Sequence, residues 1–87
     1  MKDIKNYEKL YAITENGEVW SHRSNRFIKP AVDKDGYERI CLVKDRQKKN
    51  YYVHRLVAQT YLDNPNNLPQ VNHKDENKHN NTVENLE

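Results

Sequence analysis

The sequence predicts a small α+β domain built from antiparallel β-hairpins and one helix. Three observations lead to this class. Short apolar runs alternating with polar residues fill the first half, turn sequences containing glycine separate them, and the apolar spacing becomes helical after residue 53. The chain has 87 residues, of which 34% are hydrophobic and 32% are charged. This length and composition allow one domain at most, with a small core.

The first elements are expected to be short hairpin strands. Residues 10–14 and 19–22 read as two strands joined by the pair Asn16-Gly17. We expect a tight turn here with positive φ at both central residues, which Asn-Gly favours. Residues 26–30 form a third short strand that ends at Pro30, because proline cannot donate to a sheet ladder.

The clearest strand covers residues 37–43. Its alternation places Glu38, Ile40 and Leu42 on one face and the residues between them on the other. The single cysteine, Cys41, lies in the apolar run 40–43, so we expect it to be a buried small hydrophobe. The charged segment 44–50 is expected to form a tip, after which residues 51–53 pair back.

One helix is predicted after these strands. Helical spacing is seen in Val53, Leu56, Val57, Thr60 and Tyr61, which predicts a helix of roughly two to three turns. Asp63-Asn64-Pro65 stops it because proline breaks the hydrogen-bond ladder. Residues 66–69 read as a loop. Residues 70–73 read as a short extended segment that delivers His73 to the polar stretch behind it.

Positive charge is concentrated in the middle of the chain. Residues 20–55 contain ten Lys and Arg against four acids, a net +6, and the whole chain is +2, so the remainder carries −4. A basic middle with acidic ends suggests one face for a polyanion. Solvated hairpin tips are the alternative. The side chains expected to contact such a polyanion, mostly at phosphates, are Arg23, Arg26, Arg39, Arg46, Lys48 and Lys49.

The sequence also limits where the protein is expected to work. One cysteine rules out an internal disulfide and a zinc site built on cysteine pairs. The N-terminus lacks an apolar core of signal-peptide length, and no segment is apolar enough to span a bilayer. We therefore expect a cytoplasmic protein, without a membrane partner or a small-molecule cofactor.

The candidate site is the polar stretch 69–87, which has too few apolar residues to be held by burial alone. Within it, His73 is the candidate base, because an imidazole exchanges protons near neutral pH. Asn72 and Asp75 offer hard oxygen ligands of the kind that Mg²⁺ or Mn²⁺ accepts. The amide of Asn85 would tie the two sides of the loop. A loop of satisfied polar residues around a structural histidine is the alternative interpretation.

Of two other metal sites, an EF-hand is rejected and a zinc site is disfavoured. An EF-hand loop starting at Asp75 would need glycine at its sixth position and glutamate at its twelfth, where Asn80 and Leu86 stand. A zinc site on His73 and His79 lacks further ligands at normal spacing. We expect His79 and His22 to be surface residues. His54, at the start of the helix, is expected to be packed or capping, with contact to the site or to nucleic acid as the alternative.

The residues carry a resemblance to a known family. Val53-His54-Arg55-Leu56-Val57-Ala58, then 71–78 (VNHKDENK), then Asn80-Asn81 and Asn85-Leu86-Glu87 resembles the motif of HNH endonucleases, in the form found in phage and intron-encoded homing endonucleases. The upstream part, from Tyr7 through residues 16–21 (NGEVWS) to Gly36-Tyr37, resembles the nuclease-associated modular domain. The resemblance covers nearly the whole chain. It implies a β-rich DNA-contacting region at 1–52 and an HNH region at 53–87, within one compact domain.

Roles for individual residues follow from the resemblance. It implies that His73 is the general base of a ββα-metal site and that Asn85 is the central asparagine that orients the hairpin holding it. Asn72 would stand at the position of a metal ligand. A single Mg²⁺ or Mn²⁺ ion would then stabilise the scissile phosphate and the leaving 3′ oxygen.

The motif departs from the family at its end. In HNH endonucleases an aromatic strand and a helix follow the Asn-Leu pair and supply a second metal ligand, whereas this sequence stops at Glu87. The ββα-metal motif is therefore expected to be incomplete, through truncation or loss of catalysis. The predicted function is metal-dependent hydrolysis of double-stranded DNA. The alternatives are an inactive DNA-binding module and a structural or RNA-binding domain, and the oligomeric state is left open.

Overall fold

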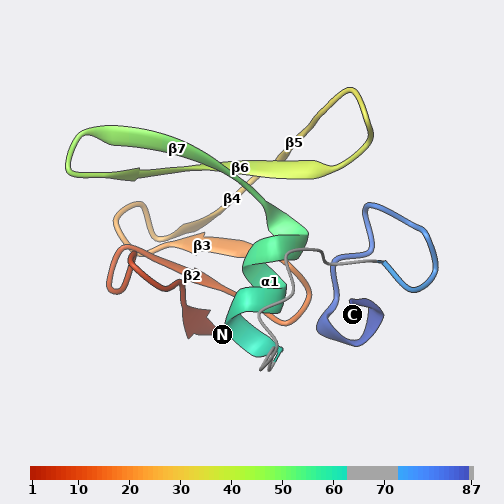
Figure 1. The fold of residues 1–87 in the computed structure, drawn as a ribbon. Helices are drawn as coiled ribbons and strands as arrows, with labels where there is room; N and C mark the ends of the chain where they lie inside the picture. The colour runs from red at the N-terminus through yellow and green to blue at the C-terminus, as the bar shows by residue number, and fades with distance from the viewer. Residues whose placement is uncertain (63–72, 87) are drawn as a thin grey trace.

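Two antiparallel sheets and one helix form the fold of the computed structural model, which describes residues 1–62 and 73–86 (Figure 1). This confirms the predicted α+β class of hairpins and one helix. The first sheet has the strand order β1-β2-β3-β4 and the second β5-β6-β7. The elements are β1 (Lys2–Asp3), β2 (Tyr11–Ile13), β3 (Val19–Ser21), β4 (Arg26–Ile28), β5 (Ala31–Val32), β6 (Glu38–Lys44), β7 (Gln47–Tyr52), α1 (Val53–Tyr61) and the 3₁₀ turn η1 (Val83–Asn85).

The turn between β2 and β3 differs from the one expected. Gly17 has a φ of +84°, but Asn16 is not among the residues with positive φ. Gly17 donates its N–H to the Thr14 carbonyl at 3.1 Å, and Thr14 donates to the Glu18 carbonyl at 2.9 Å. The loop is therefore one residue longer than a two-residue hairpin, and only the glycine takes the left-handed conformation.

β6 confirms the predicted alternation, but the interpretation of Cys41 was wrong. Ile40 and Leu42 are buried, whereas Cys41 is exposed on the opposite face of the strand. The run 40–43 is apolar throughout, so the sequence did not show that only one face of this sheet meets the core.

The turn between β6 and β7 is also tighter than expected. Asp45 and Arg46 alone make the turn, both with positive φ, so β7 starts at Gln47 rather than at Tyr51. Lys48 and Lys49 pair with Val43 and Leu42. Both lysines therefore extend from a strand rather than from an irregular loop.

α1 packs against β2, β6, β7 and η1 and closes the core. Its apolar spacing buries Val53, Leu56 and Val57, as the sequence predicted, and also buries His54. The core draws on both halves of the chain, from Ile4 and Ile13 to Leu86. Among the described residues, no helix has the length and apolar character needed to cross a membrane.

Tyrosine hydroxyls connect the first sheet and the loop before β2 to the second sheet. The hydroxyls of Tyr7 and Tyr51 lie 2.8 Å apart, and burial raises the pKa of Tyr7 to about 12. The hydroxyl of Tyr11 accepts the N–H of Val43 at 3.1 Å. These bonds hold β2 and the loop before it against the hairpin of β6 and β7.

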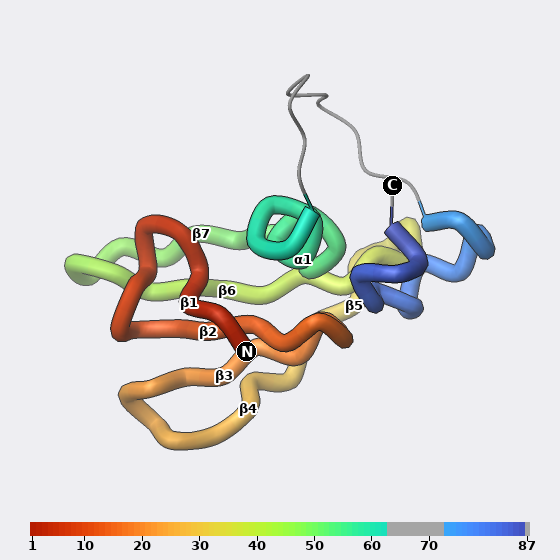
Figure 2. The backbone as a smooth tube through the Cα atoms, turned by 90° about the horizontal axis from the view of Figure 1, so that it is seen from below, coloured from red at the N-terminus to blue at the C-terminus, as the bar shows by residue number. Residues whose placement is uncertain are grey.

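The described C-terminal segment, residues 73–86, packs on the turn between β2 and β3. Val83 donates its N–H to the Glu15 carbonyl at 2.8 Å. Gly17 lies so close that a Cβ built on it would be 2.9 Å from the Cβ of Asn81. In Figures 1 and 2 this segment lies at one end of the molecule, and the turns joining β3 to β4 and β6 to β7 lie at the other.

Candidate active site

His73 is held by backbone pairing at the start of the described C-terminal segment. It forms an antiparallel bridge with Leu86, and Lys74 donates its N–H to the Asn85 carbonyl at 2.7 Å. Glu76 donates back to the His73 carbonyl at 3.0 Å, which turns the chain immediately after the histidine. The side chain is half-buried. A fixed backbone with a partly open imidazole is the arrangement that a base needs to reach a substrate proton.

Asn85 braces the loop that follows His73. Its Nδ2 donates to Asp75 Oδ1 at 2.9 Å and to the Asn80 carbonyl at 2.8 Å, while its Oδ1 accepts the N–H of Asp75 at 3.2 Å. The side chain is 8% exposed, so these bonds satisfy a buried amide. Asn85 thus ties the two sides of the loop, the connection expected from the sequence.

Asp75 organises the outer part of the same loop. A hydrogen bond from Asn80 Nδ2 lowers the pKa of Asp75, with further bonds from the Asn77 N–H and from Asn85 acting in the same direction. The carboxylate is exposed, and its oxygens accept bonds from within the loop. In this structure Asp75 is a loop-fixing residue.

A chain of side-chain hydrogen bonds leads from His73 into the second sheet. His73 Nε2 lies 2.7 Å from Asn81 Oδ1, and Asn81 Nδ2 donates to Glu38 Oε1 at 2.7 Å. Asn81 is only 3% exposed. Glu38, at the start of β6, has a side chain that is 22% exposed. The imidazole is therefore bound to a buried amide, which is bound in turn to a carboxylate.

Aromatic rings also pack against His73. Its ring centroid is 4.9 Å from that of His54 and 6.1 Å from that of Tyr37. His54 is 6% exposed and its pKa is lowered to about 4, first by burial and then by the nearby His73 and Arg55. His54 is therefore neutral near pH 7, which spares His73 a second positive charge beside it. His54 is packed, as predicted, and it also contacts His73, so the alternative prediction of contact with the site is confirmed as well.

Lys78 links the loop to the turn between β5 and β6. Its Nζ donates to the Asp35 carbonyl at 2.6 Å and lies 4.7 Å from the ring centroid of Tyr37. Tyr37 in turn packs against His54 and His73. The site is thus built from residues of both halves of the chain. The other two histidines, His22 and His79, are surface residues as expected.

The predicted metal ligand, Asn72, lies outside the described residues. Within residues 1–62 and 73–86, no group of three or more His, Cys, Asp or Glu side chains is arranged to hold a metal ion. The described donor set therefore does not by itself make a metal site, and the metal ligand role of Asn72 stays a prediction.

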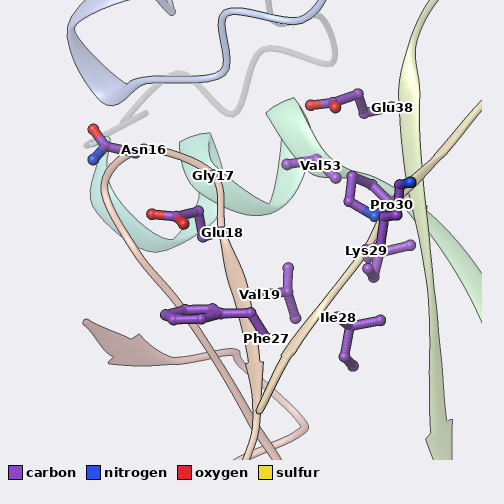
Figure 3. A pocket seen from close by; sticks show the side chains of 11 residues that line it. Asn16, Gly17, Glu18, Val19, Phe27, Ile28, Lys29, Pro30, Glu38 and Val53 are labelled. Atoms are coloured by element: carbon purple, nitrogen blue, oxygen red, sulfur yellow. The ribbon is translucent and has the colours of Figure 1, made fainter.

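A hollow of about 330 Å³ adjoins this chain of hydrogen bonds at Glu38. It runs between the turn after β2, the end of β4 and the start of β6. Figure 3 shows Glu38 and Val53 along one stretch of its wall and Glu18 and Phe27 along another. Glu38 thus borders the hollow and also binds the amide of Asn81.

The predicted DNA-contacting residues are all exposed but are not gathered around His73. Arg46 is in the turn between β6 and β7, and Lys48 and Lys49 follow it at the start of β7. Arg23 is in the turn between β3 and β4, and Arg26 begins β4. Figures 1 and 2 place both turns at the end of the molecule opposite residues 73–86. Arg39 is near the start of β6, closer to the site. A DNA duplex that contacts both the basic turns and the region around His73 must extend along the molecule.

Sequence reasoning missed two residues of this site, Glu38 and Asn81. The sequence marks Glu38 only as a member of the inward face of its strand, and Asn81 only as part of the Asn80-Asn81 pair. Nothing in the sequence says which of its many asparagines faces the histidine. The one available signal was that a charged residue, Glu38, shares a face with Ile40 and Leu42 and so needs a polar partner.

Comparisons with known proteins find one family model and several similar proteins. A family model described as the NUMOD4 motif matches residues 2–43. The chain is 49% identical over 77 residues to the uncharacterized HNH endonuclease L245 of Acanthamoeba polyphaga mimivirus, covering 88% of this chain and 23% of the relative. It is 45% identical over 85 residues to DNA endonuclease I-HmuI of Bacillus phage SP01, covering 98% and 49%.

A solved structure is similar as well. The structure described as DNA binding and cleavage by the HNH homing endonuclease I-HmuI matches with a TM-score of 0.91 and 45% identity, over 98% of this chain and 49% of that chain. The 87 residues span about a quarter of the mimivirus relative and about half of I-HmuI.

Proposed function

From the premise that the chain is a homologue of the HNH homing endonucleases and contains a NUMOD4 motif, we propose that it hydrolyses phosphodiester bonds of double-stranded DNA. His73 acts as the general base and takes a proton from the attacking water. Asn85 keeps the loop of His73 in place. The observation that carries the proposal is the half-buried imidazole, held on one side by Asn81 and backed on the other by a neutral His54.

HNH endonucleases generally use divalent metal ions, and we propose Mg²⁺ or Mn²⁺ for this chain, with Asn72 as its ligand. When bound, the ion supplies charge stabilisation at the scissile phosphate and the leaving 3′ oxygen. An amide is a weaker ligand than a carboxylate, so we expect modest metal affinity. The residues of the chain bind the DNA, orient the imidazole and accept the proton.

DNA is proposed to be held mainly through phosphate contacts. The structural neighbour I-HmuI is an endonuclease described as binding and cleaving DNA. In the present chain the hairpin of β6 and β7 exposes Arg46, Lys48 and Lys49, and the hairpin of β3 and β4 exposes Arg23 and Arg26. Contacts of this kind position a duplex without reading its sequence, and they weaken as salt increases.

Nicking of supercoiled plasmid in Mg²⁺ or Mn²⁺ tests the proposal. We expect His73→Ala to lower the nicking rate by about 10²- to 10⁴-fold, the usual contribution of a general base. His22→Ala is the matched control, because the ring of this exposed histidine bonds to Asp3, away from residues 73–86, and its loss should leave the wild-type rate unchanged. DNA binding without cleavage would instead support an inactive binding module. The absence of salt-dependent DNA binding would contradict both and favour a structural or RNA-binding domain.

A further inference from the structure

We propose that Glu38, acting through Asn81, is a positioning residue that fixes which ring nitrogen of His73 carries the proton. Glu38 lies within the segment that matches the NUMOD4 motif, so this segment contributes directly to the nuclease site. The inference deepens the proposed function and depends on it only for the consequence in catalysis. The proton arrangement itself can be measured separately.

The first step concerns the amide of Asn81. A carboxylate only accepts hydrogen bonds, so Glu38 Oε1 requires the amide to present its NH₂ group, which it does at 2.7 Å. If the amide were turned over, two oxygens would face each other inside a site where Asn81 is 3% exposed. A buried repulsion of this kind is costly, so Glu38 sets the orientation of the amide.

The second step concerns the imidazole. With its NH₂ group facing Glu38, Asn81 presents its oxygen to His73 at 2.7 Å, and an amide oxygen only accepts. The neutral ring must therefore carry its proton on Nε2. The lone pair then resides on Nδ1, which becomes the atom that can take a proton from water.

The packing around Asn81 makes this arrangement rigid. The turn at Gly17 lies directly against Asn81, and the next residues are anchored by the bond from Val83 to the Glu15 carbonyl. The second oxygen of Glu38 is 3.9 Å from Nδ1 of the exposed His79, a weak contact at most. The amide thus has a fixed backbone and one strong partner on each side.

Two substitutions of Glu38 separate positioning from structure. Glu38→Gln can still present a side-chain oxygen to Asn81 and should keep the arrangement. Glu38→Lys presents only donors, so it should turn the amide over and direct NH₂ toward His73. The ring would then accept at Nε2 and carry its proton on Nδ1, the nitrogen needed as a base. The side chain of Glu38 is 22% exposed, so a lysine here can face Asn81 while its charged group keeps some contact with water.

The readout is the ¹⁵N chemical shifts of the His73 ring, measured on the 87-residue protein above the pH at which the ring is protonated. We expect the Nε2–H form in the wild type and in Glu38→Gln, and the Nδ1–H form in Glu38→Lys. In nicking assays kcat should fall about 10- to 100-fold in Glu38→Lys without a rise in KM for DNA, while Glu38→Gln stays near wild type.

The outcomes distinguish the two proposals. An Nδ1–H ring in the wild type, or the same ring form in all three proteins with unchanged urea denaturation, would overturn the positioning role. If the ring forms change as expected but no protein cleaves DNA, the positioning role stands and the proposed endonuclease function fails.

Discussion

At the scale of single residues, the site depends on histidines whose surroundings give them different charges. His73 is half-buried and bound to an amide, whereas His54 is enclosed beside it with its pKa lowered to about 4. A neutral neighbour packs against the candidate base without repelling the positive charge that forms when the base takes a proton.

The low pKa of His54 predicts how folding stability depends on pH. The unfolded chain binds a proton at this residue below about pH 6.5, whereas the folded protein does so only near 4. Stability is therefore complete above pH 6.5 and decreases as the pH falls toward 4, by up to about 3 kcal/mol. Urea denaturation between pH 7 and 4 measures this dependence.

His54→Phe provides the control, because it keeps a ring of similar size but cannot titrate. The wild type should lose more stability than this variant across the window. Equal losses would show that the pKa of His54 is the same in the folded protein as in the unfolded chain. Below about pH 4 carboxylates such as Asp75, whose pKa is lowered, add a further loss in both proteins.

The residues of the site were only partly predictable from the sequence. His73 and Asn85 were found because they stand in a polar stretch that cannot be held by burial. Glu38 and Asn81 were not, because their pairing joins positions 43 residues apart and depends on how the chain packs. Cys41 was misjudged, since neighbours in sequence do not reveal which face of a strand meets the core.

At the scale of elements, the turn between β2 and β3 supports residues 73–86, which contain the candidate site. Gly17 has positive φ and lies against Asn81, and Glu15 anchors Val83. Asn16-Gly17 predicts this hairpin, but nothing in the sequence predicts its contact with residues 81–83. The two-residue strands β1 and β5 were missed as well, because elements this short have no periodicity to read.

Two glycines allow the contact at this turn to be measured. Gly17 and Gly36 both have positive φ, so replacing either by alanine carries a backbone cost of about 1 kcal/mol. A Cβ on Gly36 would meet only Lys78 Cδ at 3.5 Å, an ordinary contact, whereas one on Gly17 would approach Asn81 at 2.9 Å. We expect Gly17→Ala to cost about 2 kcal/mol or more in urea denaturation, and Gly36→Ala about 1 kcal/mol.

The same variants report on the site. Gly17→Ala should shift the side-chain amide resonances of Asn81, while Gly36→Ala should leave them near their wild-type positions. Equal destabilisation by both substitutions, with no change at Asn81, would mean that the turn does not support the amide.

At the scale of the whole molecule, the candidate site and the main basic turns lie at opposite ends (Figure 2). The molecule measures 33 × 30 × 20 Å, so its long axis matches about ten base pairs of B-DNA at 3.4 Å each. The charge pattern along the sequence indicated a basic surface but not this separation, which arises because the two hairpins point the same way, away from residues 73–86.

The tip between β6 and β7 should therefore affect affinity rather than chemistry. Replacing Arg46, Lys48 and Lys49 by alanine should weaken DNA binding and reduce the slope of log K against log salt by up to about 3, near 0.9 for each phosphate that is no longer neutralised. Gln47→Ala combined with Asn50→Ala changes the same hairpin without changing its charge and should keep the wild-type slope. Equal slopes in all three proteins would remove this hairpin from the DNA interface.

Chemical rescue tests the central claim, that the His73 ring removes a proton from water, most directly. His73→Gly leaves space for a small base, so added imidazole should restore plasmid nicking in proportion to its neutral form, while Asn85→Ala should not respond. His73→Gly that nicks at the wild-type rate would contradict the claim. The claim would also be contradicted if His73→Gly binds DNA normally and keeps its fold, yet remains inactive at every imidazole concentration while the wild type cleaves.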